Sequence, residues 1–203
     1  EFKTSGGKFE KIRLDKLFNV KSNPQLNKDS FNFSENGVYP YFTRTVLNNG
    51  IAGYVDYLDE EHKISGNSLA VGMLGMQFFY MEKDFYAGQF TKTIYPKFDY
   101  FNSKVAQYFI VLLNKNQKIY QGSLVRDFER LFYNTKILLP TLGGEINFSF
   151  MEKFIEELER ERVEELDAYL AVTGLKDYKL TDKEQAALVE FEEFSQMRSA
   201  GEF

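Results

Sequence analysis

Short runs of apolar residues, separated by turn residues, dominate the first half of the chain. Residues 8–20 carry regularly spaced apolar side chains and predict a strand that leads into a short helical turn. Residues 38–43 and 51–57 are rich in Tyr, Val, Phe and Ile and predict two strands. The segment Asn48–Gly50 between them predicts a tight turn, because Asn and Gly tolerate the positive φ that such turns require. The pattern therefore predicts a β-hairpin.

Further strands are predicted before the pattern changes to that of a helix. They are expected within residues 62–74, 77–81 and 85–96, where glycines interrupt apolar runs. Asn102 is a suitable N-cap for the helix that follows it, whose apolar residues recur every three or four positions. A basic and less regular stretch over residues 115–135 precedes the segment "KILLP", which predicts a final buried strand ended by Pro140 and the Gly143–Gly144 pair.

The last quarter of the chain has a highly charged helical pattern. Ser149 and Glu152 form a Ser-x-x-Glu capping box, which predicts a helix start. A break at Gly174 and a second capping box, Thr181 with Glu184, predict a second helix and hence a helical hairpin. One narrow seam runs along the first helix, and its members are Met151, Ile155, Leu158, Arg162, Leu166 and Tyr169. A seam this narrow is better suited to pairing with another helix than to lying on a broad core.

Together these patterns predict an α+β fold in two parts. Residues 8–145 are expected to form a mainly β domain with short helices. Residues 149–197 are expected to form a long C-terminal helical hairpin of coiled-coil type. Periodicity leaves two arrangements open, because the hairpin could fold back on its own domain or pair with another molecule.

Composition adds a large aromatic core and argues against several classes of function. The chain has 21 Phe and 13 Tyr, and hydrophobic residues make up 43%, as in a globular protein. It has no Cys, and His62 is its one imidazole, so we expect no disulfide, metal site or other cofactor. No apolar run approaches the roughly 20 residues that cross a bilayer, and there is no signal-peptide pattern. We therefore expect a cytoplasmic protein that does not contact a membrane.

Charge is distributed unevenly along the chain. Residues 1–150 hold 18 Lys and Arg against 15 Asp and Glu, whereas residues 151–203 hold 7 against 15. Within the first part, residues 91–136 hold eight cations against three acids. Such a local excess can attract a polyanion by counterion release, although a solvated lysine face would have the same composition.

The motifs of common catalytic sites are missing from the sequence. There is no P-loop, no Gly-x-Gly-x-x-Gly after a strand, and no Asn-Pro-Pro-aromatic motif of the amino-methyltransferases. Asp56, Glu61 and Lys63 are similar to the groups by which many nucleases hold a metal, but only four residues separate the two acids. We therefore expect no catalytic residues, and a metal-dependent nuclease is the less favoured alternative.

Several segments, taken in order, resemble a known family. They are "GVYPYFTRTVLNNGIAGYVDY", "GNSLAVGMLGMQFFYMEKDFYAGQF", "NSKVAQYFIVLLN", and "KILLP" before "FSFMEKFIEELE". In order and content they resemble the target-recognition domain and following helix of the specificity (S) subunits of type I and related type II restriction-modification systems. "YLAVTGLKDYKLTDKE" is similar to the continuation in some of these proteins, so the resemblance covers about residues 8–195.

The resemblance implies a non-catalytic subunit that reads a half-site in duplex DNA and docks methyltransferase subunits. Complete type I members usually carry two recognition domains and two helical regions, whereas this sequence has one of each and no internal repeat. A homodimer paired through the C-terminal helices would restore the two-fold arrangement. The seam residues of the first predicted helix are therefore the expected dimerisation residues, and S-adenosylmethionine would belong to the partner subunit.

The same resemblance implies that the predicted hairpin turn faces DNA. The expected contacts are Thr43, Arg44, Thr45, Asn48 and Asn49, with phosphates favoured over bases. Less stereotyped positions would carry specificity, and they are Lys63, Gln77, Lys83, Gln89, Lys92, Lys115, Lys118, Gln121, Arg126 and Arg130, with Tyr120 as a stacking or phosphate-binding group. The structural alternatives are that Arg44 braces the turn, that the lysines serve solubility, and that Tyr120 packs in the core.

A function of another class stays open on this evidence. The chain could be a protein-interaction module whose acidic hairpin binds a helical partner and whose β domain is a scaffold. Reversing the charges of Lys92, Lys115, Lys118, Arg126 and Arg130 would separate the two interpretations, because a scaffold would be indifferent to the change.

Overall fold

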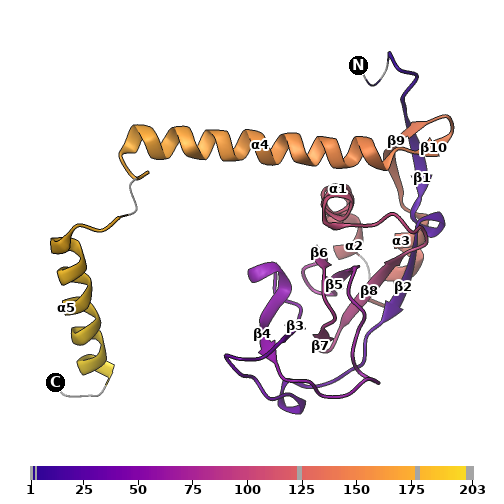
Figure 1. Cartoon of the computed structure of the whole chain (residues 1–203). Coiled ribbons are helices and arrows are strands. Elements are labelled where there is room, and N and C mark those ends of the chain that lie inside the picture. Colours follow the sequence, from indigo (N-terminus) through magenta and orange to yellow (C-terminus); the bar gives the residue numbers. More distant parts are fainter. Residues whose placement is uncertain (1, 3, 123–124, 177–178, 200–203) are drawn as a thin grey trace. The chain divides into compact units, whose positions relative to one another are not determined.

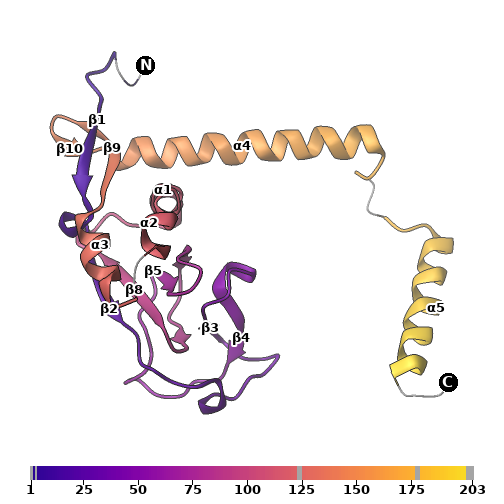
Figure 2. The same cartoon turned by 180° about the vertical axis from the view of Figure 1, so that it is seen from behind.

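The computed structural model describes residue 2 and residues 4–122, 125–176 and 179–199, with the backbone alone at residues 125 and 192–199. The chain divides into two compact units, Glu1–Glu157 and Leu158–Phe203. Figure 1 and Figure 2 show the elements from opposite sides. The first unit contains the sheets and the short helices, and the second is helical in its described part.

The strands of the described residues form small, mostly antiparallel sheets (Figure 1). In one sheet the order is β1 (Lys8–Arg13), β9 (Lys136–Leu142) and β10 (Glu145–Ile146). A second sheet has the order β2 (Phe18–Ser22), β8 (Thr91–Pro96), β5 (Ser68–Gly72) and β6 (Phe78–Met81). The third has the order β4 (Ile51–Val55), β3 (Tyr39–Phe42) and β7 (Tyr86–Ala87), with β7 parallel to β3. The mainly β character of the first domain is thereby confirmed.

Helices follow and interrupt these strands. The 3-10 turns are η1 (Leu14–Lys16), η2 (Lys28–Ser30), η3 (Asn48–Gly50) and η4 (Val125–Asp127). The α-helices are α1 (Ser103–Asn114), α2 (Gln117–Gln121), α3 (Phe128–Asn134), α4 (Phe148–Thr173) and α5 (Asp182–Ser199). Residues 115–135, which the sequence presents as irregular, thus contain two short helices, because Tyr120, Phe128 and Phe132 all find buried positions in the core.

The sheet formed by β2, β8, β5 and β6 lies at the centre of the first unit. On one face, Leu69 and Ile94 pack with Val105, Phe109 and Leu113 of α1. The opposite face packs against the sheet of β3, β4 and β7, where the ring centroids of Phe42 and Phe79 are 6.2 Å apart. Every residue of β5 is buried, as expected for a strand covered on both faces.

The turn between β3 and β4 has the backbone that its sequence predicts. Asn48, Asn49 and Gly50 all have positive φ, of 46°, 53° and 80°. A side chain at Gly50 would also overlap the ring of Phe42, since an added Cβ would lie 2.2 Å from Cε2. Thr43 N donates a 2.8 Å hydrogen bond to Gly50 O and closes the turn. The hairpin prediction is confirmed.

The prediction of a strand at β9 is confirmed, and the strand stops directly before the Gly143–Gly144 pair as expected, but Pro140 does not end it and it is not the final strand. The strand continues to Leu142, and β10 pairs with its end. The nitrogen and carbonyl of one strand residue point to the same side of the strand, and Pro140 O accepts from Asn147 N at 2.9 Å. The missing N–H therefore lies on the side away from β1, whose ladder with β9 is undisturbed.

Helix α4 begins differently from the prediction. Asn147, not Ser149, caps it, because Asn147 Oδ1 accepts a hydrogen bond from Phe150 N at 3.0 Å. Glu152 accepts instead from Tyr100 Oη and Asn102 Nδ2. The prediction of a capping box between Ser149 and Glu152 is therefore wrong, because tertiary contacts hold the Glu152 carboxylate.

The other helix-end predictions are confirmed. Asn102 Oδ1 accepts from Val105 N at 3.1 Å and caps α1. Gly174, at φ +74°, follows the end of α4. Thr181 N donates to Glu184 Oε2 at 2.7 Å, and Glu184 N donates to Thr181 Oγ1 at 3.4 Å, which completes a capping box at the start of α5. The long C-terminal helix is confirmed, and its pairing with α5 in a hairpin stays a prediction.

Candidate nucleic-acid interface

The segment between β3 and β4 meets two other chain segments at the surface. Gly72 lies so close to it that an added Cβ would be 2.7 Å from Arg44 Cα. At Gly75 an added Cβ would be 2.7 Å from Val46 Cγ1. Met73 N donates a 2.9 Å hydrogen bond to Phe90 O, so residues 72–76 contact both the hairpin turn and the β7–β8 connection. We call the surface formed by residues 43–50, 72–76 and 88–90 the turn surface.

Arg44 is the cation at the centre of the turn surface. Its side chain is exposed, and its guanidinium carbon lies 5.5 Å from the centroid of the Phe90 ring. In the described part of the chain, no carboxylate lies within salt-bridge distance of Arg44. Its charge is therefore available to an anion. The alternative that Arg44 braces the turn stays open, although hydroxyl and amide groups also hold this backbone.

Hydroxyl and amide groups hold the backbone of the turn. Thr43 Oγ1 accepts from Thr45 N at 3.4 Å, and Thr45 Oγ1 accepts from Leu47 N at 3.1 Å. Asn48 Nδ2 donates to Ile51 O at 3.2 Å. These predicted contact residues thus shape the turn that carries Arg44, and each hydroxyl oxygen keeps a lone pair for a further hydrogen bond.

A pocket of about 240 Å³ opens beside Arg44. Its lining residues are Leu26, Asn27, Lys28, Tyr41, Thr43, Arg44, Ala52, Gly88 and Gln89. Gln89 Nε2 donates to Asn27 Oδ1 at 2.7 Å, which orients both amides. The pocket thus combines a guanidinium, an ammonium, hydroxyls and amides, which are the groups that bind phosphates and base edges. Sequence reasoning missed Asn27 and Lys28, because they lie in a polar loop that carries no motif.

Amides also line a second pocket, of about 400 Å³, next to the hairpin turn. Its lining residues are Asn49, Gln77, Phe78, Phe79, Tyr80, Gln107, Ile110 and Asn114. Asn114 Oδ1 accepts from Phe78 N at 2.9 Å, which holds the end of α1 against β6. The pocket thus brings together Asn49 and Gln77, which are both among the predicted DNA contacts. Gln107 and Asn114 were missed, although two polar residues seven positions apart on α1 share one helix face.

Helix α2 adjoins the turn surface through two glutamines. Gln117 Nε2 and Gln121 Nε2 donate to Gly75 O at 2.5 and 2.9 Å. The role of Gln121 therefore includes anchoring the backbone of residues 72–76, which its sequence position did not suggest. Lys115 precedes these glutamines in the sequence, Lys118 lies between them, and both lysines are exposed.

The other predicted cations differ in their surroundings. Lys83 and Arg126 are exposed, and Arg130 lies 3.4 Å from Asp127 Oδ1. Lys92 is partly buried, and its Nζ donates to Ser22 Oγ at 2.7 Å. Within the described ranges, none of these four side chains forms a hydrogen bond or ion pair with the turn surface, so their DNA contacts stay predictions.

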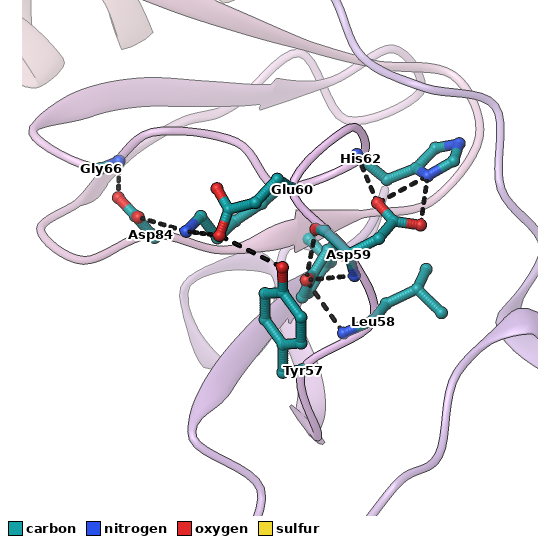
Figure 3. A network of polar contacts seen from close by, with 9 residues as sticks. Tyr57, Leu58, Asp59, Glu60, His62, Gly66 and Asp84 are labelled. Atoms are coloured by element: carbon teal, nitrogen blue, oxygen red, sulfur yellow. Dashed lines mark hydrogen bonds and ion pairs between the residues drawn. The ribbon is translucent and has the colours of Figure 1, made fainter.

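Lys63 belongs to an acidic network at the 57–66 loop, which Figure 3 shows. Its Nζ lies 2.7 Å from Glu60 Oε1 and 3.6 Å from Asp84 Oδ2. The hydrogen bond from Lys63 holds the pKa of Glu60 below its ordinary value, and Glu60 in turn raises the pKa of Lys63. Two carboxylates thus balance this ammonium. These ion pairs compete with any phosphate for Lys63, so we expect this predicted residue to contribute little to DNA binding.

The same loop is held by Tyr86 and by His62, which Figure 3 shows beside Asp59. Tyr86 Oη accepts from the backbone N–H groups of Leu58 and Asp59 at 3.0 and 3.1 Å and donates to Asp59 O at 2.9 Å. His62 Nδ1 lies 2.8 Å from Asp59 Oδ2, and hydrogen bonds from His62 lower the pKa of Asp59. The contacts are those of a braced loop.

The nuclease alternative finds no assembled site in this loop. Asp56 Oδ2 accepts from Asn32 Nδ2 at 2.6 Å, whereas Lys63 pairs with Glu60 and Asp84. Over the residues that the structure describes, no three His, Asp or Glu side chains gather closely enough to hold a metal ion. Asp56, Glu61 and Lys63 therefore have separate partners or solvent.

Tyr120 is a correction to the predicted interface. Its side chain is fully buried, and its ring packs against Phe78 and Phe128 with centroids 5.8 and 5.5 Å away. Burial raises the pKa of its hydroxyl to about 12. A base or phosphate has no access to this group, so the core-packing alternative is the right one.

The predicted seam of α4 divides into two parts. Met151 and Ile155 are buried, and Met151 belongs to the core of the first unit. These two residues are corrections, because they attach the start of α4 to its own domain. Leu158, Leu166 and Tyr169 are exposed, and Arg162 Nη1 pairs with Glu165 Oε2 at 2.6 Å. The exposed seam thus begins at Leu158.

Within the described ranges, none of the helices combines the length and apolar character needed to cross a membrane.

Comparison with known proteins gives a sequence family and a fold. Residues 7–168 match the sequence profile of the type I restriction modification DNA specificity domain. No curated protein sequence matches the chain. The S subunit of a type I restriction-modification system from M. genitalium has a TM-score of 0.51 and 18% identity, over 83% of this chain and 44% of its own.

Two further solved structures have similar folds. The HsdS subunit from Thermoanaerobacter tengcongensis gives a TM-score of 0.53 at 12% identity, over 90% of this chain and 44% of its own. A structure described under complex assembly and conformational transition of the type I R-M system gives a TM-score of 0.55 at 12% identity, over 81% of this chain and 41% of its own. The chain thus spans less than half the length of these structures.

Proposed function

Because the chain belongs to the type I restriction-modification DNA specificity family, we propose that it reads a short sequence in duplex DNA and catalyses no reaction itself. The observation that carries this proposal is the turn surface. There an exposed guanidinium with no carboxylate partner among the described residues lies beside pockets lined by Asn49, Gln77 and Gln89. Such a surface offers charge for phosphates and oriented amides for base edges.

The charge distribution supports the same orientation on DNA. Arg44 and Lys28 line one pocket, and Lys115 and Lys118 lie on or next to the helix that contacts Gly75. Each phosphate that such a cation neutralises releases condensed counterions from the duplex. Residues 151–203 carry an excess of eight acids and would be repelled by DNA. Residues 8–145 therefore act as the recognition domain and residues 149–197 as a spacer.

The exposed seam of α4 has a role in assembly under this proposal. A second copy of the chain covers Leu158, Leu166 and Tyr169 in a paired-helix contact, which produces a homodimer with two recognition domains. Each domain then reads one half-site, and the helices set the spacing between half-sites. Methyltransferase subunits dock on this framework and supply the chemistry and the methyl donor.

Binding to duplex DNA as a function of salt tests the proposal. The full chain is mixed with a fluorescent pool of random-sequence duplexes, and anisotropy is measured from about 50 mM to about 200 mM salt. Affinity is expected to fall steeply, and Arg44→Ala should lower the slope of log affinity against log salt by about one. Lys63→Ala is the matched control, because it also removes one positive charge, but one that is already paired with Glu60 and Asp84. Weak binding that is insensitive to salt, or cleavage of the pool in magnesium, would overturn the proposal.

A further inference from the structure

Phe90 is exposed in a conformation that a bulky residue rarely adopts. Its φ is +56°, in the left-handed region, and 49% of its surface is accessible. The other described non-glycine residues with positive φ have ready explanations. Asn48, Asn49 and Asn67 are asparagines, which tolerate this region, and Met76 is buried in the core. Neither explanation applies to Phe90.

The fold holds Phe90 in this position from both sides. Phe90 N donates to Gln25 Oε1 at 3.2 Å, and Phe90 O accepts from Met73 N at 2.9 Å. Its neighbour Thr91 is buried and starts β8, so the backbone is anchored where the ring turns outward. A strained residue that the surroundings hold in place is typical of a functional site.

The surroundings of the ring combine positive charge and apolar side chains. The Arg44 guanidinium lies over the ring at 5.5 Å from its centroid. Leu47 and Leu74, at 75% and 68% exposure, project from the two segments that adjoin Arg44 and Phe90. Apolar side chains that project from a cationic surface are the arrangement by which proteins insert wedges between base pairs.

We propose that Phe90 is a wedge that inserts its ring at one base step of the bound duplex, while Arg44 contacts the adjacent phosphate. This inference rests on the proposed function, because it names how the turn surface distorts the same DNA. Insertion would cover the exposed ring and kink the duplex at that step. Recognition would then depend on the flexibility of the step as well as on hydrogen bonds to base edges.

The experiment first isolates a duplex and then examines its base steps. The full chain selects duplexes from a random-sequence pool, and the selected duplex is rebuilt with 2-aminopurine at successive positions. Unstacking of one step is expected to raise the fluorescence at that position when the chain binds. Phe90→Asn should abolish the rise and weaken binding about tenfold, the scale of one lost base–aromatic contact. Because Asn tolerates the left-handed region, the Phe90→Asn chain should resist unfolding by urea at least as well as the parent chain.

Tyr54→Ala is the matched control, since Tyr54 is an exposed aromatic residue on β4 outside the turn surface. It should leave the fluorescence rise in place. If the parent chain retains duplexes but changes fluorescence at no position, Phe90 is not a wedge, even if Phe90→Asn weakens binding through Arg44. An equal signal from Phe90→Asn and the parent would also overturn the inference. If no duplex is retained at low salt, the proposed function itself fails.

Discussion

Glu152 of α4 accepts a 2.5 Å hydrogen bond from Nδ2 of Asn102, the residue whose Oδ1 caps α1. One asparagine thus joins the start of one helix to the first turn of another, and Tyr100 Oη adds a 2.7 Å hydrogen bond to the same carboxylate. Met151 and Ile155 bury the neighbouring face. The start of α4 is therefore a fixed part of the first unit and not a flexible linker.

This contact makes stability depend on pH. Hydrogen bonds from Tyr100 and then Asn102 lower the pKa of Glu152, so the ionised form stabilises the fold. The contribution is complete above the unfolded-state pKa and is lost as pH falls through the lower folded-state pKa. Glu152→Gln should cost about 1 kcal/mol near pH 7, and the difference should shrink below about pH 4. Urea unfolding at both pH values measures it.

The control for this prediction is Glu145→Gln, which changes an exposed carboxylate on β10. It should leave the free energy of unfolding unchanged at either pH. If Glu152→Gln lowered that free energy equally at both values, the charged form would have no special role in the contact.

The two parts of the α4 seam should respond differently to substitution. Met151→Ala leaves a cavity in the core and should lower the free energy of unfolding by about 2–5 kcal/mol without separating paired copies. Leu166→Glu changes an exposed residue and should yield monomers with the unfolding midpoint of the isolated chain unchanged. Analytical ultracentrifugation and urea unfolding distinguish the two effects. A Leu166→Glu chain that sediments like the parent would exclude this seam as a dimer contact.

Gly72 should matter for DNA binding although its side chain is a hydrogen atom. A methyl group there would lie 2.7 Å from Arg44 Cα, so Gly72→Ala must shift the backbone that presents the guanidinium. We expect affinity for duplex DNA to fall about tenfold, since correct placement governs a charge-assisted contact. At Gly122 an added Cβ meets only carbonyl oxygens at 3.5 and 3.9 Å, so Gly122→Ala is the control and should bind normally.

Tyr120 and Lys118, which lie two positions apart on α2, should have separable roles. Tyr120→Phe keeps the buried ring and should leave the salt dependence of DNA binding unchanged. Lys118→Glu reverses an exposed charge and should weaken binding several-fold at low salt, with less effect at high salt. Anisotropy titrations at two salt concentrations test both. A change in DNA affinity for Tyr120→Phe would show that the core-packing interpretation is incomplete.

Some features of this protein follow from short sequence segments. The Asn48–Gly50 turn, the Asn102 cap of α1 and the Thr181 capping box were predicted because their hydrogen bonds join residues seven or fewer positions apart. Such contacts depend on residue type and spacing alone. The ordered segments of the recognition domain also belong here, since the family profile matches residues 7–168.

Other features depend on packing between distant parts of the chain. Sequence placed Tyr120, Met151 and Lys63 on functional surfaces, yet core packing buries the first two and carboxylates neutralise the third.

The sequence by itself determined the β3–β4 hairpin, the caps of α1 and α5, the family and the uneven charge, because each is encoded by neighbouring residues or by composition. The tertiary structure alone decided which polar and apolar groups stay accessible, and it brought Arg44 against Phe90 across 46 residues. Burial and long-range pairing depend on which segments pack together in the folded chain, and local periodicity does not specify which segments these are.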